Sequence, residues 1–175
     1  MSFLVGVYCS LTSLILSHIP MQEKSSPIQV VIFLGLECPI SQKYMHRLNE
    51  MSEFYGDKVE WIAYIPEKRS PSEIKTFADE YAARFKIVAD ANLTHTKRLK
   101  ATVTPEAFLI RGEKVLYRGA IDNWFYELGR YRTETTEYYL RDALDAVVNG
   151  KEVMTAKTDA VGCFIQMPSE GHKHH

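Results

Sequence analysis

One cysteine lies where a thiol is readily activated. Cys38 follows Val30 to Leu34, a short apolar run rich in β-branched residues that predicts a buried strand. Pro39 comes next and suits a first helical turn, because its missing N–H group costs nothing there. One apolar face of the following helix is predicted from residues at helical spacing: Ile40, Tyr44, Leu48, Met51 and Tyr55. Free N–H groups and the helix dipole at this junction favour a thiolate, so Cys38 is a candidate nucleophile.

A second interpretation of Cys38 is a small buried hydrophobe, which is what an isolated cysteine usually is. The neighbouring Glu37 would raise the pKa of the thiol and oppose its activation. Residue types and spacing leave both interpretations open.

The composition of the chain indicates the general class of protein and the kinds of ligand that it is not suited to bind. A chain of 175 residues with 46% hydrophobic and 25% charged residues is typical of one globular domain. The formal net charge of −1 provides no basic surface for nucleic acid. Three cysteines allow one disulfide bridge at most, and no cofactor-binding motif such as a glycine-rich phosphate loop is present.

The N-terminal segment differs from the rest. No Lys, Arg, Asp or Glu occurs from Phe3 to Ile19, so residues 1–20 are a candidate signal peptide or membrane anchor. Export is therefore expected, to a periplasmic or membrane-tethered location, although a cytoplasmic one stays open because no basic residues precede the apolar run. The alternative is an N-terminal element packed on the domain. Residues 21–150 would form that domain, and residues 151–175 a C-terminal extension carrying Cys163.

The spacing of apolar residues, together with helix-capping and turn residues, predicts the order of the elements. Ser70-Pro-Ser-Glu73 forms a capping box before a helix, and Arg111 to Lys114 is a hairpin turn. Residues 122–133 are expected to be a loop rich in aromatic residues. The remaining predictions are strands at 59–65, 86–89, 107–110 and 115–118, and helices at 90–100 and 136–149. Alternating strands and helices with a late hairpin predict an α/β fold with a mixed central sheet flanked by helices.

This order resembles the thioredoxin fold, and more narrowly the thioredoxin-like redoxin family of the alkyl hydroperoxide reductase and thiol-specific antioxidant superfamily. The stretches that carry the resemblance are Glu37 to Tyr44, Val103 to Ile110, Leu116 to Asp122, Tyr139 to Leu144 and Val161 to Ile165. The resemblance implies thiol–disulfide oxidoreductase chemistry on protein or peptide thiols, with Cys38 as nucleophile. It also implies that Pro105 is a cis proline facing Cys38, and that Thr104 and Pro105 form an edge on which substrate docks.

The sequence departs from this family near the thiol. The usual second cysteine is replaced by Ser41, and the alternative upstream position is Gly35. Cys163 is therefore the candidate resolving thiol, and the Ser41 hydroxyl could hydrogen-bond the thiolate. Thiol peroxidases of this superfamily carry a threonine where this chain has Gly35, which makes peroxidase activity a weaker hypothesis.

Two further hypotheses remain. The missing local cysteine favours a catalytically silent thioredoxin fold used for binding. A copper-binding accessory protein that uses Cys38 and His95 is least favoured, since two ligands make a weak site, and no metal site is predicted. The aromatic loop 122–132 could cover a partner surface, although core packing is favoured for Trp124 and Phe125. The oligomeric state is not predicted.

Overall fold

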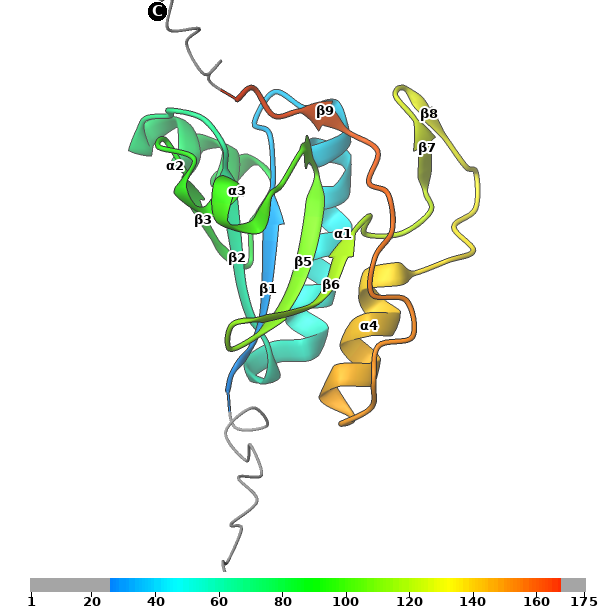
Figure 1. Cartoon of the computed structure of the whole chain (residues 1–175). Coiled ribbons are helices and arrows are strands. Elements are labelled where there is room, and N and C mark those ends of the chain that lie inside the picture. The colour runs from blue at the N-terminus through cyan, green and yellow to red at the C-terminus, as the bar shows by residue number, and fades with distance from the viewer. Residues whose placement is uncertain (1–25, 168–175) are drawn as a thin grey trace, which may run out of the picture.

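A five-stranded mixed sheet forms the centre of the fold in the computed structural model, which describes residues 26–167 (Figure 1). The strand order is β3-β2-β1-β5-β6. β1 pairs in parallel with β2 and antiparallel with β5, so it is the central strand. The strands are β1 (Ile28–Phe33), β2 (Glu60–Ile65), β3 (Lys86–Ala89), β5 (Glu106–Arg111) and β6 (Lys114–Gly119). The predicted α/β class and mixed sheet are confirmed.

The apolar run around β1 supplies two cores, one on each face of the sheet. Successive side chains of a strand point to opposite faces. Val30 and Ile32 belong to the larger cluster, whereas Val31 and Phe33 belong to the smaller one, and all four are fully buried. A strand buried on both faces reads as a continuous apolar run, which is why β1 is recognisable in the sequence.

Helices cover both faces. α1 (Pro39–Tyr55), α2 (Pro71–Glu80) and α4 (Tyr139–Val148) contribute Leu48, Phe77 and Leu144 to the larger core. α3 (Thr94–Leu99) contributes Leu99 to the smaller core. Figure 1 shows α1 and α3 on opposite sides of β1. The capping box predicted at Ser70 is present at the start of α2.

α3 is shorter than the predicted helix over residues 90–100. Leu93 and Lys100 both adopt left-handed backbone conformations, with φ of 56° and 55°, and they end the helix on either side. The buried Asp90 carboxylate accepts hydrogen bonds from the backbone N–H groups of His95 and Thr96, so it caps the first turn from outside the helix.

Two stretches expected to be irregular contain strands. The aromatic loop forms a small hairpin, β7 (Phe125–Glu127) and β8 (Arg130–Tyr131), with Gly129 in the turn at φ of 76°. Phe125 is buried and Trp124 packs against the larger core, as predicted. In the C-terminal extension, β9 (Cys163–Phe164) pairs with β4 (Val103–Thr104). The strands of both pairs are only two or three residues long, and β4 and β9 come from segments far apart in the sequence.

Within residues 26–167, no helix has the length and apolar character needed to cross a membrane. The predicted signal peptide or anchor at residues 1–20 lies outside the described residues. The domain boundaries and the exported location therefore stay predictions.

Candidate active site

Cys38 is the N-cap residue of α1 and ends the short loop that follows the central strand β1. Its backbone is extended, with φ of −80° and ψ of 112°, and its N–H group donates to the carbonyl of Gly35. Pro39 then occupies the first helical position. Cys38 is only 4% exposed, so protein groups rather than water surround most of its side chain.

A loop from the other half of the chain faces this thiol. The Thr104–Pro105 peptide bond is cis, the isomer that the resemblance implies. The carbonyl oxygen of Thr104 lies 3.1 Å from Cys38 Sγ and accepts a hydrogen bond from the Cys38 thiol. This contact places the end of β4 directly against the candidate nucleophile.

Cys163 reaches the same point from the C-terminal segment, residues 151–167. β9 runs antiparallel to β4, with Thr104 opposite Cys163, and the N–H of Ile165 donates to the carbonyl of Thr102. The two sulfurs, both free thiols, are 2.8 Å apart, and Cys163 donates toward Cys38. The structure thus brings together two residues that are 125 positions apart in the sequence.

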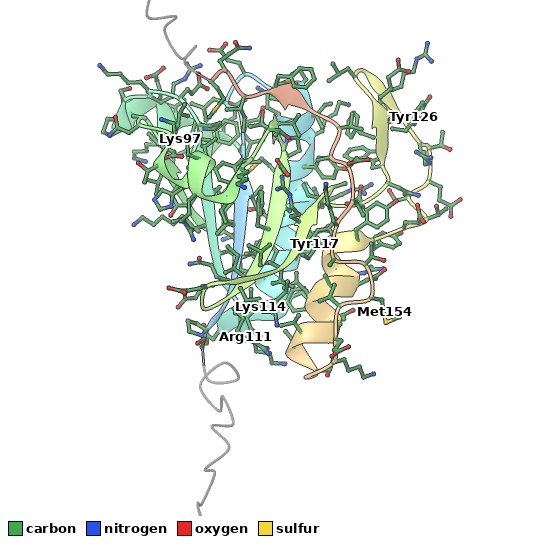
Figure 2. The ribbon with its side chains drawn as sticks, viewed as in Figure 1. Lys97, Arg111, Lys114, Tyr117, Tyr126 and Met154 are labelled. Atoms are coloured by element: carbon green, nitrogen blue, oxygen red, sulfur yellow. The ribbon has the colours of Figure 1, made fainter. Side chains whose placement is uncertain are left out.

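Close backbone packing holds the C-terminal segment in this position. A Cβ atom on Gly162 would lie 2.2 Å from the carbonyl oxygen of Thr104, so only glycine fits immediately before Cys163. A second anchor is Thr158, whose hydroxyl bonds the Tyr117 hydroxyl at 2.6 Å and accepts from the N–H of Ala120. Figure 2 shows Tyr117 on β6, beside the passing C-terminal segment.

Ser41 lies at the position where a second cysteine was expected, and its side chain is fully buried. Its hydroxyl accepts from the N–H of Gly35 at 3.1 Å and hydrogen-bonds the Cys38 sulfur. Gly35 is itself confined: a Cβ there would lie 2.9 Å from both Cys38 Cβ and Thr104 Oγ1. A side chain at position 35 would therefore crowd the thiol.

The surroundings of the two thiols shift their pKa values in opposite directions. Burial raises the pKa of Cys38, but hydrogen bonds from the Cys163 thiol and from Ser41 outweigh it and hold that pKa below its ordinary value. Burial and the neighbouring Cys38 sulfur raise the pKa of Cys163 to about 11. Cys38 is therefore the better thiolate, with Cys163 as its proton-bearing partner. Glu37, which was expected to oppose the thiolate, is ion-paired with Arg69 at 2.9 Å.

Two small cavities adjoin the thiol pair. One, of about 250 Å³, is bordered by both cysteines and by the charged residues Glu37, Glu67 and Arg69. The other, of about 270 Å³, is bordered by Cys163 and by apolar side chains of α1 and of the β7–β8 hairpin. A larger cavity of about 630 Å³ lies between α1 and α4, but neither cysteine borders it.

His95, which was considered as a copper ligand together with Cys38, does not border either cavity beside the thiol pair. The His95 ring stacks on Tyr64 with centroids 3.9 Å apart. Among residues 26–167, no three His, Cys, Asp or Glu side chains are grouped so that they could hold a metal ion.

The Thr104 edge, which was expected to dock substrate, is occupied by the chain's own β9, and the sequence pattern does not predict this pairing. Gly162, the glycine before Cys163, was the available signal. Docking of a substrate at Thr104 and Pro105 stays a prediction.

Comparison with known proteins identifies the fold. No protein-family model matches the chain, and no curated protein matches it. A hypothetical protein from Sinorhizobium meliloti 1021 is similar in structure, with a TM-score of 0.71, 25% identity, and coverage of 83% of this chain and 82% of that one. An uncharacterized conserved protein from Geobacillus kaustophilus gives 0.71, 24%, 85% and 82%, respectively. A thioredoxin-like protein in its oxidized form gives a TM-score of 0.54 at 15% identity, covering 73% of this chain and 81% of that one.

Proposed function

The fold is thioredoxin-like, and we propose that this chain is a two-cysteine thiol–disulfide oxidoreductase acting on protein or peptide substrates. Cys38 is the nucleophile and Cys163 the resolving thiol. The observation that carries the proposal is the 2.8 Å approach of the two sulfurs, with the Cys163 thiol donating toward Cys38. A lone thiolate would stop at the mixed disulfide, whereas a second thiol in reach can complete the exchange.

The reaction follows from this pair. The Cys38 thiolate attacks one sulfur of a substrate disulfide, forming a mixed disulfide and expelling the other substrate sulfur as a thiolate. Cys163 then loses its proton to that leaving thiolate or to water and attacks the Cys38 sulfur. This attack expels the second substrate sulfur as a thiolate, which takes a proton from solvent, so the substrate leaves as a dithiol and a Cys38–Cys163 disulfide remains. Ser41 supports the first step because its hydroxyl stabilises the Cys38 thiolate.

Substrate access requires β9 to move. While Cys163 is paired opposite Thr104, the β4 edge cannot pair with a second extended segment. We therefore expect β9 to detach when substrate docks at Thr104 and Pro105, and to return for resolution. Export to an oxidising compartment, which the N-terminal segment predicts, would suit a protein that cycles through a disulfide.

The test uses a Cys9→Ser variant, so that Cys38 and Cys163 are the only thiols. A non-reducing peptide map after oxidation should show one Cys38–Cys163 linked peptide that disappears on reduction. Reduction of a peptide disulfide should be lost in Cys38→Ser, and Cys163→Ser should accumulate the mixed disulfide on Cys38. Two free thiols after oxidation, with Cys38 alkylating like an ordinary cysteine, would leave the fold as a binding module.

A further inference from the structure

Cys163 borders both small cavities, whereas Cys38 borders only the charged one. The apolar cavity of about 270 Å³ is bordered by Cys163 but not by Cys38. Its walls include Ile40 of α1 and Phe125, Leu128 and Tyr131 of the β7–β8 hairpin. Cys38 is 4% exposed, whereas Cys163 is half-buried. A group that arrives through this cavity therefore meets the Cys163 sulfur.

The leaving-group ability of the two sulfurs also favours attack on Cys163. When a thiolate attacks a disulfide, the sulfur that leaves faster is the one whose thiol has the lower pKa. In a Cys38–Cys163 disulfide that sulfur is Cys38, because Ser41 hydrogen-bonds it, whereas within residues 26–167 no hydrogen bond lowers the pKa of Cys163. Attack on Cys163 thus expels the better leaving group.

The rim of the cavity is suited to a polypeptide. Two large apolar side chains that border it are more than half exposed, Leu128 at 56% and Tyr131 at 51%. Phe164, on β9 next to Cys163, is 76% exposed and borders the neighbouring charged cavity. The cavity volume suits one large side chain rather than a cofactor. An apolar side chain next to a partner's cysteine could fill the cavity and hold that cysteine near Cys163.

We propose that the oxidised protein is recycled by a peptide or protein thiol whose apolar neighbouring side chain enters this cavity, and that the thiol attacks Cys163. This inference rests on the proposed function, because it requires the Cys38–Cys163 disulfide. Substrate disulfides and the recycling thiol then use different sulfurs and different sides of the site.

The recycling reaction passes through a mixed disulfide between Cys163 and the partner. The partner thiolate forms a bond to Cys163 Sγ, the Cys38–Cys163 bond breaks, and its electron pair leaves on Cys38 as a thiolate. A second partner thiolate, from the same molecule or another, attacks the partner sulfur of this mixed disulfide. The partner is oxidised to a disulfide, and Cys163 leaves as a thiolate and takes a proton from solvent.

The first experiment locates the mixed disulfide. The oxidised Cys9→Ser chain is mixed for milliseconds with the peptide thiol acetyl-Cys-Phe-amide, quenched with excess N-ethylmaleimide, and mapped by mass spectrometry. The expected result is peptide on Cys163 and maleimide on Cys38. The reverse labelling would overturn this inference while leaving the proposed function intact. If the chain forms no disulfide to begin with, the proposed function itself fails.

The second experiment tests the cavity. Acetyl-Cys-Phe-amide should reduce the oxidised chain about three- to tenfold faster than acetyl-Cys-Ser-amide, because the cavity shields the apolar surface of the phenyl group from water. Leu128→Ala should remove most of this preference. Met154→Ala is the matched control, since Met154 is 94% exposed and lies on the C-terminal segment beside α4, away from the hairpin that carries Tyr126 (Figure 2). Equal rates for both peptides, or a preference that survives Leu128→Ala, would refute the role of the cavity.

Discussion

At the scale of single residues, the function of the candidate site depends on the residue that replaces a second local cysteine. Ser41 is buried in the first turn of α1, and its hydroxyl joins the Gly35 N–H to the Cys38 sulfur. A hydroxyl here cannot resolve a mixed disulfide, but it can stabilise a thiolate. The loss of the local partner is therefore compatible with a reactive Cys38, provided that another thiol is available.

Replacement of Ser41 by alanine is expected to raise the pKa of Cys38, because the thiolate loses a hydrogen-bond donor. The curve of alkylation rate against pH should move to higher pH, toward the ordinary cysteine value of about 8.5. The N–H of Gly35 also loses its acceptor, which should cost about 1–3 kcal/mol of unfolding free energy.

Ser52→Ala is the matched control for that experiment. Ser52 is also buried on α1, but it lies about three helical turns beyond Ser41 and its hydroxyl donates to the carbonyl of Asn49. It should leave the alkylation profile in place. An unchanged profile in Ser41→Ala as well would show that Ser41 does not set the reactivity of Cys38.

At the scale of elements, the site depends on the docking of β9 onto β4. The pairing is only two residues long, so it is stable only because the C-terminal segment is held at both ends. Thr158 anchors one end against β6, and Ile165 packs with the smaller core at the other. Between these anchors, Gly162 permits the close approach to Thr104 that places Cys163 over Cys38.

Gly162→Ala is expected to lift β9 away from Thr104, because the new Cβ would collide with the Thr104 carbonyl. Formation of the Cys38–Cys163 disulfide by a small oxidant should slow by about 10- to 100-fold, as reacting groups displaced by about 1 Å lose this much rate. Quenched time points analysed by peptide mapping would give the rate.

Gly150→Ala separates this effect from a general loss of stability. Gly150 has φ of 70°, so alanine is strained there, but no neighbouring atom lies within 4 Å of the added Cβ. Stability should fall modestly, with the disulfide rate unchanged. Equal rates in the two variants would argue against the role assigned to Gly162.

At the scale of the whole molecule, a buried carboxylate connects the hairpin, α1 and the segment before α4. Asp122 is 4% exposed and accepts from the Tyr44 hydroxyl, the Arg47 guanidinium and the N–H of Trp124. Arg47 also donates to Thr135. Through these bonds Asp122 fixes the base of the hairpin whose side chains form the apolar cavity beside Cys163.

Asp122→Ala is expected to reduce the free energy of unfolding by about 2–3 kcal/mol, because it leaves Arg47 and the Tyr44 hydroxyl without their acceptor. This value is below the usual cost of breaking a buried ion pair, since Arg47 is partly open to solvent. Denaturant titration measures it.

Glu127→Gln, which breaks the exposed pair with Arg130 on the same hairpin, serves as the control and should change stability by less than about 1 kcal/mol. If Asp122→Ala costs no more than this control, the hairpin is not held by Asp122.

The sequence alone determined the elements whose signals are local. The apolar run of β1, the capping box of α2 and the glycine turn between β5 and β6 each depend on residues close together in the chain, and the structure confirms them. The position of Cys38 at a strand–helix junction follows from the same local pattern. These features fixed the fold class and one of the two thiols of the candidate site.

Only the tertiary structure decided where Cys163 lies. Neither β4 nor β9 has a periodic pattern of its own, because each is two residues long and is stabilised by the other. The approach of the two sulfurs depends on contacts at Gly162, Thr158 and Ile165 with distant strands, and sequence spacing does not encode such contacts. The sequence could therefore name both cysteines, but whether they meet was settled by packing between segments far apart in the chain.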